Sequence, residues 1–164
     1  MATCHIQDRY RQFDMLNKIL ALLTLFSLYG CSYLTDFYII NASDNTIFVE
    51  YKVEDFDLLG PFVSDPYITT MDKNFEHNQE EITETIIRDI KNKTIKCELN
   101  PGQSLWLGDD INFNIKSQSD RTKLEKKIVY LKIEIPEGVL SANKSNIVSS
   151  LEVFDIHHVG IEIE

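Results

Sequence analysis

The sequence predicts an antiparallel β-sandwich of about seven strands, immunoglobulin-like or related, in one domain over residues 37–164. Three observations predict it. Apolar and polar residues alternate with a period of two through most of this range, turn-forming residues separate the alternating stretches, and no β-α-β rhythm is present. Alternation places one face of each strand in a core and the other in water.

The first two expected strands form a hairpin. Residues 37–40 (FYII) are a short apolar strand, and residues 42–45 (ASDN) carry turn chemistry, because Asp and Asn side chains bond their own backbone. From residue 47 to residue 53 apolar side chains then alternate with Glu50 and Lys52. This pattern indicates a strand with one buried face.

Residues 59–78 are expected to form a long excursion from the sheet, because the alternation stops there. Long loops are uncommon unless they bind something or are disordered. This segment is therefore the first place to look for function.

One short helix is expected at residues 79–91. Their isoleucines are spaced four residues apart, with acidic residues near the start and basic residues near the end, which suits a helix dipole. The alternative is a hairpin over residues 82–99 that turns at Asn92-Lys93, which the isoleucines and threonines favour.

The remaining strands are expected further along the chain. They lie at residues 95–99, 104–107, 111–115 and 129–135 and in the region 151–163. Residues 117–126 (SQSDRTKLEK) and 141–146 (SANKSN) are expected to be polar loops. Residues 98–104 (ELNPGQS) resemble an inter-strand turn common in immunoglobulin-like and related sandwiches.

An apolar run precedes this domain, at residues 19–29 (ILALLTLFSLY) with Lys18 before it. As a helix this run would rise about 16 Å at ~1.5 Å per residue. A bilayer core is about 30 Å thick and needs ~20 apolar residues. The run is therefore too short to span a membrane, but it has the length of a signal-peptide core.

The four residues Leu28-Tyr29-Gly30-Cys31 resemble the lipobox of a bacterial lipoprotein signal peptide. The resemblance implies cleavage between Gly30 and Cys31, removal of residues 1–30 as a signal peptide, and lipid attachment to Cys31. Beginning at Met15 gives a compact leader, so residues 1–14 are interpreted as an over-extended reading frame. The alternative is that the run is a buried helix and Cys31 a core cysteine.

The lipoprotein resemblance also implies a location in the bacterial cell envelope, anchored to a membrane. Ser32 follows Cys31 in place of the aspartate that retains many lipoproteins in the inner membrane. By this analogy the outer membrane is favoured, if the cell has one. Residues 31–36 would be a lipidated N-terminus with a tether that reaches about 17 Å at ~3.4 Å per residue.

Charge restricts the partners of the expected mature chain, residues 31–164. It carries 13 basic and 24 acidic residues, a net charge of −11. This field repels phosphate backbones, so nucleic acid is not expected as a partner, whereas a basic protein would be attracted.

The sequence contains no recognisable catalytic motif. It lacks a glycine-rich phosphate loop, a G-x-S-x-G elbow, H-E-x-x-H and a Cys-x-x-Cys pair, so no enzyme activity and no cofactor are expected. His157 and His158 are weak metal candidates, because adjacent strand residues point to opposite faces. Cys97 lies in an alternating strand and is expected to be a buried core residue.

The aromatic residues Phe56, Phe62, Tyr67 and Phe75 are candidates for partner binding, because aromatic side chains are enriched in binding hot spots. The alternative is that most of them fill the core.

These observations favour a lipid-anchored envelope protein that acts as a non-enzymatic protein-binding or assembly module. One alternative is an acidic immunity-type inhibitor of a periplasmic toxin. Another is a ligand-binding or hydrolytic envelope protein that uses the 59–78 segment as a lid.

Overall fold

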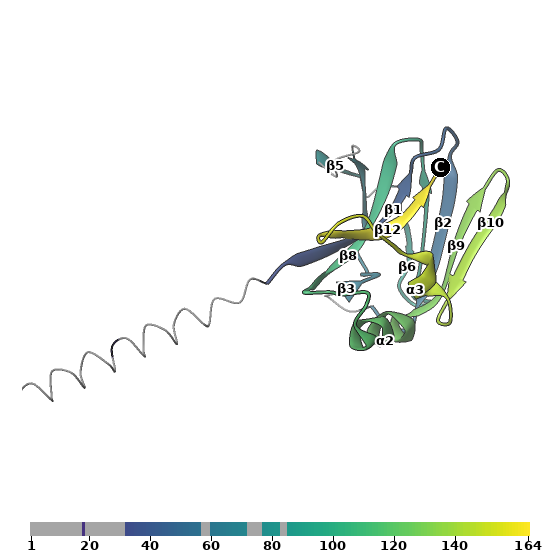
Figure 1. Cartoon of the computed structure of the whole chain (residues 1–164). Helices are drawn as coiled ribbons and strands as arrows, with labels where there is room; N and C mark the ends of the chain where they lie inside the picture. Colours follow the sequence, from purple (N-terminus) through teal and green to yellow (C-terminus); the bar gives the residue numbers. More distant parts are fainter. Residues whose placement is uncertain (1–17, 19–31, 57–59, 72–76, 83–84) are drawn as a thin grey trace, which may run out of the picture. The chain divides into compact units, whose positions relative to one another are not determined.

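The computed structural model describes residues 18, 32–56, 60–71, 77–82 and 85–164. The chain divides into two units, Met1–Ser32 and Tyr33–Glu164. The strands and helices labelled in Figure 1 all belong to the second unit. No helix in the described part of the chain has the length and apolar content needed to cross a membrane.

Two β-sheets pack face to face in this unit, which confirms the predicted β-sandwich (Figure 1). Sheet A contains β1 (Leu34–Asn41), β3 (Gly60–Pro61), β4 (Tyr67–Met71), β5 (His77–Ile82), β8 (Gln103–Ile111), β11 (Glu152–Val153) and β12 (His158–Ile163). Its order is β11-β12-β1-β8-β4-β5, with β3 paired to β8. Sheet B contains β2 (Ile47–Val53), β6 (Ile87–Asp89), β7 (Thr94–Leu99), β9 (Ile128–Ile135) and β10 (Gly138–Asn143), in the order β10-β9-β2-β7-β6.

The described strands depart from the prediction in their pairing, their number and their starting point. The expected hairpin of residues 37–53 is wrong, because β1 pairs within sheet A and β2 within sheet B. The described residues form twelve strands, more than the expected number of about seven, because several are only two or three residues long. All pairs are antiparallel except that of β1 with β12, which is parallel. The first strand begins at Leu34, three residues before the predicted start of the domain.

The core lies between the sheets and is made by the inward residues of both. Along β2, the alternate residues Ile47, Val49, Tyr51 and Val53 are all buried, as the alternation predicts. Inward residues of other strands are Phe37 and Ile39 in β1, Ile95 and Cys97 in β7, and Leu105 and Leu107 in β8. Cys97 is 6% exposed, which confirms its expected place in the core.

The predicted helix over residues 79–91 is wrong. Its described residues include the end of β5 and the whole of β6, and β6 pairs with β7 in the register Ile87↔Lys96. The hairpin alternative holds for residues 87–99, where β6 and β7 turn at residues 90–93, but not for Ile82, which belongs to β5 of sheet A. Ile86 is buried whereas Ile87 and Ile90 are exposed, so the spacing of four did not mark one apolar face.

The predicted excursion at residues 59–78 is also wrong for the residues that the structure describes. β3 and β4 pair with β8, and β5 extends the sheet beyond β4. Tyr51 donates a hydrogen bond from its hydroxyl to the Val63 carbonyl oxygen (3.2 Å), which fixes the connection between β3 and β4 to the core.

The predicted polar loop at residues 117–126 is instead helix α2 (Gln118–Lys127). Ser117 caps it by accepting a hydrogen bond from the Asp120 backbone N–H (3.5 Å), and Lys126 and Lys127 lie in its last turn, where the helix dipole favours positive charge. Leu124 is its one buried residue, so the sequence contains no apolar stripe that could reveal the helix.

Two smaller boundaries differ from the prediction. β8 ends at Ile111, and Asn112 takes a positive φ of 56°, so residues 111–115 do not form a strand of their own. β10 extends through residues 138–143, and a short helix, α3 (Ile147–Ser150), follows the predicted loop at 141–146.

Gly108 allows β3 and β8 to lie against each other. Its φ is +129°, and a Cβ atom there would lie 2.3 Å from the Gly60 carbonyl oxygen and 2.8 Å from Val63 Cγ1. Real Cβ atoms do not approach backbone oxygen so closely. Only glycine fits this position without moving β3.

We expect Gly108→Ala to lower the free energy of unfolding by about 3–5 kcal/mol, from the sum of backbone strain and overpacking. Gly102→Ala is the matched control, because Gly102 also has a positive φ (+76°) but open space around it. The Gly102→Ala substitution should lower the free energy of unfolding by only about 1–2 kcal/mol. Urea unfolding measures the free energy of unfolding of both variants. An equal decrease in the two would contradict the close contact between Gly108 and Gly60.

Candidate functional site

The sequence-predicted site residues that the structure describes are not gathered in one place. Phe56 is partly buried and packs against the core, whereas Phe62 is 1% exposed and belongs to it. Burial therefore removes Phe62 from any partner-binding surface. Tyr67 is partly buried on the outside of sheet A, and Phe75 lies outside the described residues. The three described aromatics do not form one exposed patch.

The predicted cleavage and lipid-attachment residues, Gly30 and Cys31, also lie outside the described residues. The chain just after them is described. The Tyr33 backbone N–H donates to Asn112 Oδ1 (2.9 Å), the Tyr33 hydroxyl donates to the Phe113 carbonyl oxygen (3.0 Å), and the Asn112 N–H donates to the Tyr33 carbonyl oxygen (2.8 Å). The domain is thus fixed from Tyr33 onward.

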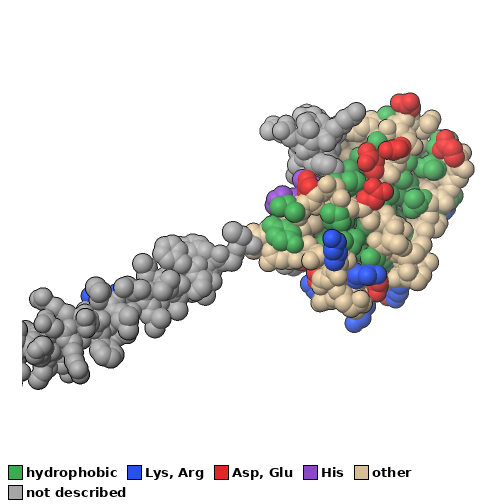
Figure 2. Space-filling view, viewed as in Figure 1, with side chains coloured by type: hydrophobic (Ala, Val, Ile, Leu, Met, Phe, Trp, Pro, Cys, Tyr) green, Lys and Arg blue, Asp and Glu red, His purple; other side chains and the backbone are tan. Residues whose placement is uncertain are grey.

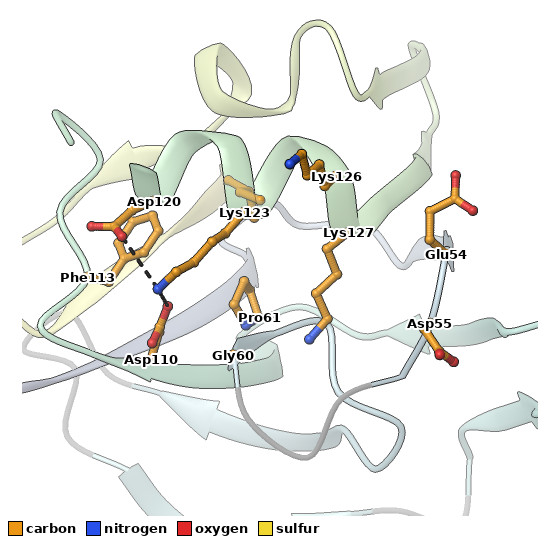
Figure 3. Close-up of a pocket in the computed structure, with 11 residues that line it drawn as sticks. Glu54, Asp55, Gly60, Pro61, Asp110, Phe113, Asp120, Lys123, Lys126 and Lys127 are labelled. Carbon is orange, nitrogen blue, oxygen red and sulfur yellow. Dashed lines mark ion pairs between the residues drawn. The ribbon is translucent and has the colours of Figure 1, made fainter. Parts of the chain in front are cut away.

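A cleft of about 390 Å³ lies between helix α2 and the residues Glu54, Asp55, Gly60 and Pro61 (Figure 3). Buried Phe113, Leu124 and Pro61 supply its apolar part. Its charged lining residues are Glu54, Asp55, Asp110, Asp120, Lys123, Lys126 and Lys127. Sequence reasoning missed this site because α2, which makes one of its walls, looked like a polar loop.

The lysines of α2 occupy different places around the cleft. Lys123 Nζ lies 3.6 Å from Asp120 Oδ1 and 3.9 Å from Asp110 Oδ2, so its charge is shared between two carboxylates. Lys127 extends across the cleft toward Gly60, and Lys126 is exposed on the helix (Figure 3). Apolar groups bordered by both signs of charge suit binding of a polypeptide segment with mixed side chains.

A second cluster occupies the face of sheet A that points away from sheet B. Trp106 Nε1 donates a hydrogen bond to Asp36 Oδ1 (2.8 Å), and the Trp106 ring stacks on Tyr67 with centroids 4.8 Å apart. Tyr38 lies fully buried among these groups. Burial, and then the nearby Asp36 carboxylate, raise the pKa of the Tyr38 hydroxyl, so it stays protonated.

Asp109 lies opposite Asp36 in the β1–β8 pair. Partial burial raises the pKa of the Asp109 carboxyl, and the carboxylates of Asp36 and Asp110 raise it further. A carboxyl whose pKa is higher in the folded than in the unfolded chain contributes stability at low pH. That contribution is lost as the pH rises through the folded-state pKa.

His157 and His158 make separate polar contacts. His157 Nδ1 lies 3.0 Å from the Leu34 carbonyl oxygen, and His158 Nδ1 lies 2.9 Å from Asp155 Oδ2. Their ring centroids are 6.4 Å apart. Over the described ranges, no three His, Cys, Asp or Glu residues are grouped so that they could hold a metal ion.

The Cys97 side chain lies in the core, and burial is the main cause that raises the pKa of its thiol, to about 12. The thiolate is the nucleophilic form, so Cys97 is unreactive at neutral pH.

No family model, no curated protein and no solved structure matches this chain.

We expect Asp109→Asn to raise the free energy of unfolding at pH 7, because the amide is not ionised beside Asp36 and Asp110. The gain should shrink as the pH falls toward 3, where the Asp109 carboxyl becomes protonated. Chemical unfolding at a series of pH values measures this difference.

Asp44→Asn is the control for the change in net charge, because Asp44 is exposed in the turn before β2. The same pH-dependent gain in both variants would show that overall charge, and not the surroundings of Asp109, causes the effect.

Proposed function

We propose that this chain is a bacterial lipoprotein precursor whose mature domain acts as a non-enzymatic protein-binding or assembly module at an envelope membrane. One observation carries the proposal: an eleven-residue apolar run ends at Tyr29, and Leu28-Tyr29-Gly30-Cys31 resembles a lipoprotein cleavage site. Lipid on Cys31 would hold the domain at the membrane, and by the Ser32 analogy this would be the outer membrane where one exists.

The attachment of Tyr33 to Asn112 and Phe113, just after β8, supports close docking at the membrane. Because β1 begins at Leu34, only Ser32 lies between Cys31 and the first residue that is bonded to the domain. This segment is shorter than the tether expected from sequence, which ran to residue 36. A domain with so little free chain suits assembly on a membrane-bound complex better than capture of distant substrates.

The cleft beside α2 supports a polypeptide partner. Its apolar residues lie beside lysines and carboxylates, and the mature chain carries a net charge of −11, which disfavours nucleic acid. The same charge favours one second candidate, an acidic immunity-type inhibitor that binds a basic toxin in the periplasm. We do not retain the alternative of a ligand-binding or hydrolytic protein that uses residues 59–78 as a lid. The described residues of this segment that form strands belong to sheet A.

We expect Cys31→Ala to abolish incorporation of radiolabelled fatty acid and to release the protein from the membrane fraction, because it removes the thiol that would carry the lipid. Cys97→Ala is the matched control and should keep both properties, since Cys97 is in the core. Metabolic labelling with palmitate and fractionation of cells measure the result. Equal labelling of the two variants would contradict the lipoprotein assignment.

We expect a photo-crosslinking residue at Lys126, beside the cleft, to join the protein to a discrete envelope protein in living cells. The control position is Lys91, which is equally a lysine exposed to solvent but lies in the β6–β7 turn. Gel shifts after irradiation, followed by mass spectrometry, measure the adducts. Adducts of the same kind at both positions, or none at Lys126, would count against the cleft as the partner site.

A further inference from the structure

Three large apolar side chains are exposed at the end of the domain where β1 begins. Leu34, Ile111 and Ile156 are 44%, 59% and 69% exposed. Figure 2 shows hydrophobic side chains at the surface beside the start of the described domain. We name these three residues the apolar corner.

Strand pairing brings the apolar corner together. Leu34 lies directly opposite Ile111 in the β1–β8 pair, so both side chains point to the same face of sheet A. Ile156 lies on the other side of β1, because its carbonyl oxygen accepts a hydrogen bond from Thr35 Oγ1 (3.3 Å). His157 fixes this contact further, since its carbonyl oxygen accepts from the Asp36 N–H (2.7 Å).

The length of chain before the apolar corner limits its distance from a lipid on Cys31. Two peptide units separate the Cα atoms of Cys31 and Tyr33, a reach of at most about 7.6 Å at ~3.8 Å each. The interfacial layer on each side of a bilayer core is about 5–8 Å thick. The chain therefore reaches no further than the thickness of this layer.

We propose that the apolar corner is a membrane-contacting surface that sits in the headgroup layer of the bilayer that holds the anchor. This inference rests on the proposed function, because it requires the lipid on Cys31. The neighbouring carboxylates Asp36 and Asp155 oppose attraction to anionic lipid. The contact is therefore apolar and shallow, with no requirement for anionic headgroups.

The test expresses the full chain in cells and purifies the processed, lipidated protein. This protein is reconstituted into phosphatidylethanolamine–phosphatidylcholine vesicles that contain a nitroxide-labelled lipid. A bimane fluorophore is attached to Ile156→Cys, with Ile111→Cys as a second position. Ile87→Cys is the matched control, because Ile87 is 67% exposed but lies on β6 of sheet B. Unsubstituted protein measures background labelling of the buried Cys97.

The lipid-borne nitroxide should quench bimane at Ile156 and Ile111 at least twofold more than at Ile87. Equal quenching at all three positions, with palmitate present on Cys31, would overturn the membrane contact and leave the proposed function intact. Absence of fatty acid on Cys31 would overturn both. We expect the same quenching in vesicles with and without anionic lipid. Quenching that requires anionic lipid would contradict the apolar nature of the contact.

Discussion

The central position of β1 in sheet A is the constraint on which the rest of the structure depends. β1 pairs with β8 on one side and with β12 on the other, so the first and last strands of the domain are neighbours. Phe37 and Ile39 enter the core, and Tyr38 is buried on the opposite face. Because both faces and both edges of β1 are occupied, its position is fixed, and with it that of Tyr33.

The two proposed surfaces both follow from how β8 ends beside the start of β1. At Ile111 the strand supplies part of the apolar corner, and at Phe113 the chain supplies part of the cleft under α2. Tyr33 bonds to Asn112, which lies between them, and to Phe113 itself. A partner in the cleft would therefore bind near the chain segment that leads to Cys31, the proposed site of the lipid, and this arrangement would suit assembly at a membrane surface.

Local sequence patterns were sufficient to predict the buried residues of strands that have one buried and one exposed face. The alternation of apolar and polar residues in β2 marked its core residues, and the same alternation in β7 predicted that Cys97 is buried. They failed where burial was sparse. Helix α2 buries only Leu124, so no apolar stripe marked it. Ile82, Ile86 and Ile90 are spaced as on one face of a helix, but Ile86 is buried whereas Ile90 is exposed in the turn after β6. The cleft could not be predicted, since α2 forms one of its walls.

The sequence by itself determined the mainly-β class, the inward residues of the longer strands and the burial of Cys97, because these depend on periodicity within a few residues. It also supplied the lipobox resemblance at Cys31, on which the proposed function rests. Only the tertiary structure decided the parallel pairing of β1 with β12, the place of β3 to β5 in sheet A, and the gathering of Leu34, Ile111 and Ile156 at one corner. These features join residues far apart in the chain, and local periodicity carries no information about which strands become neighbours.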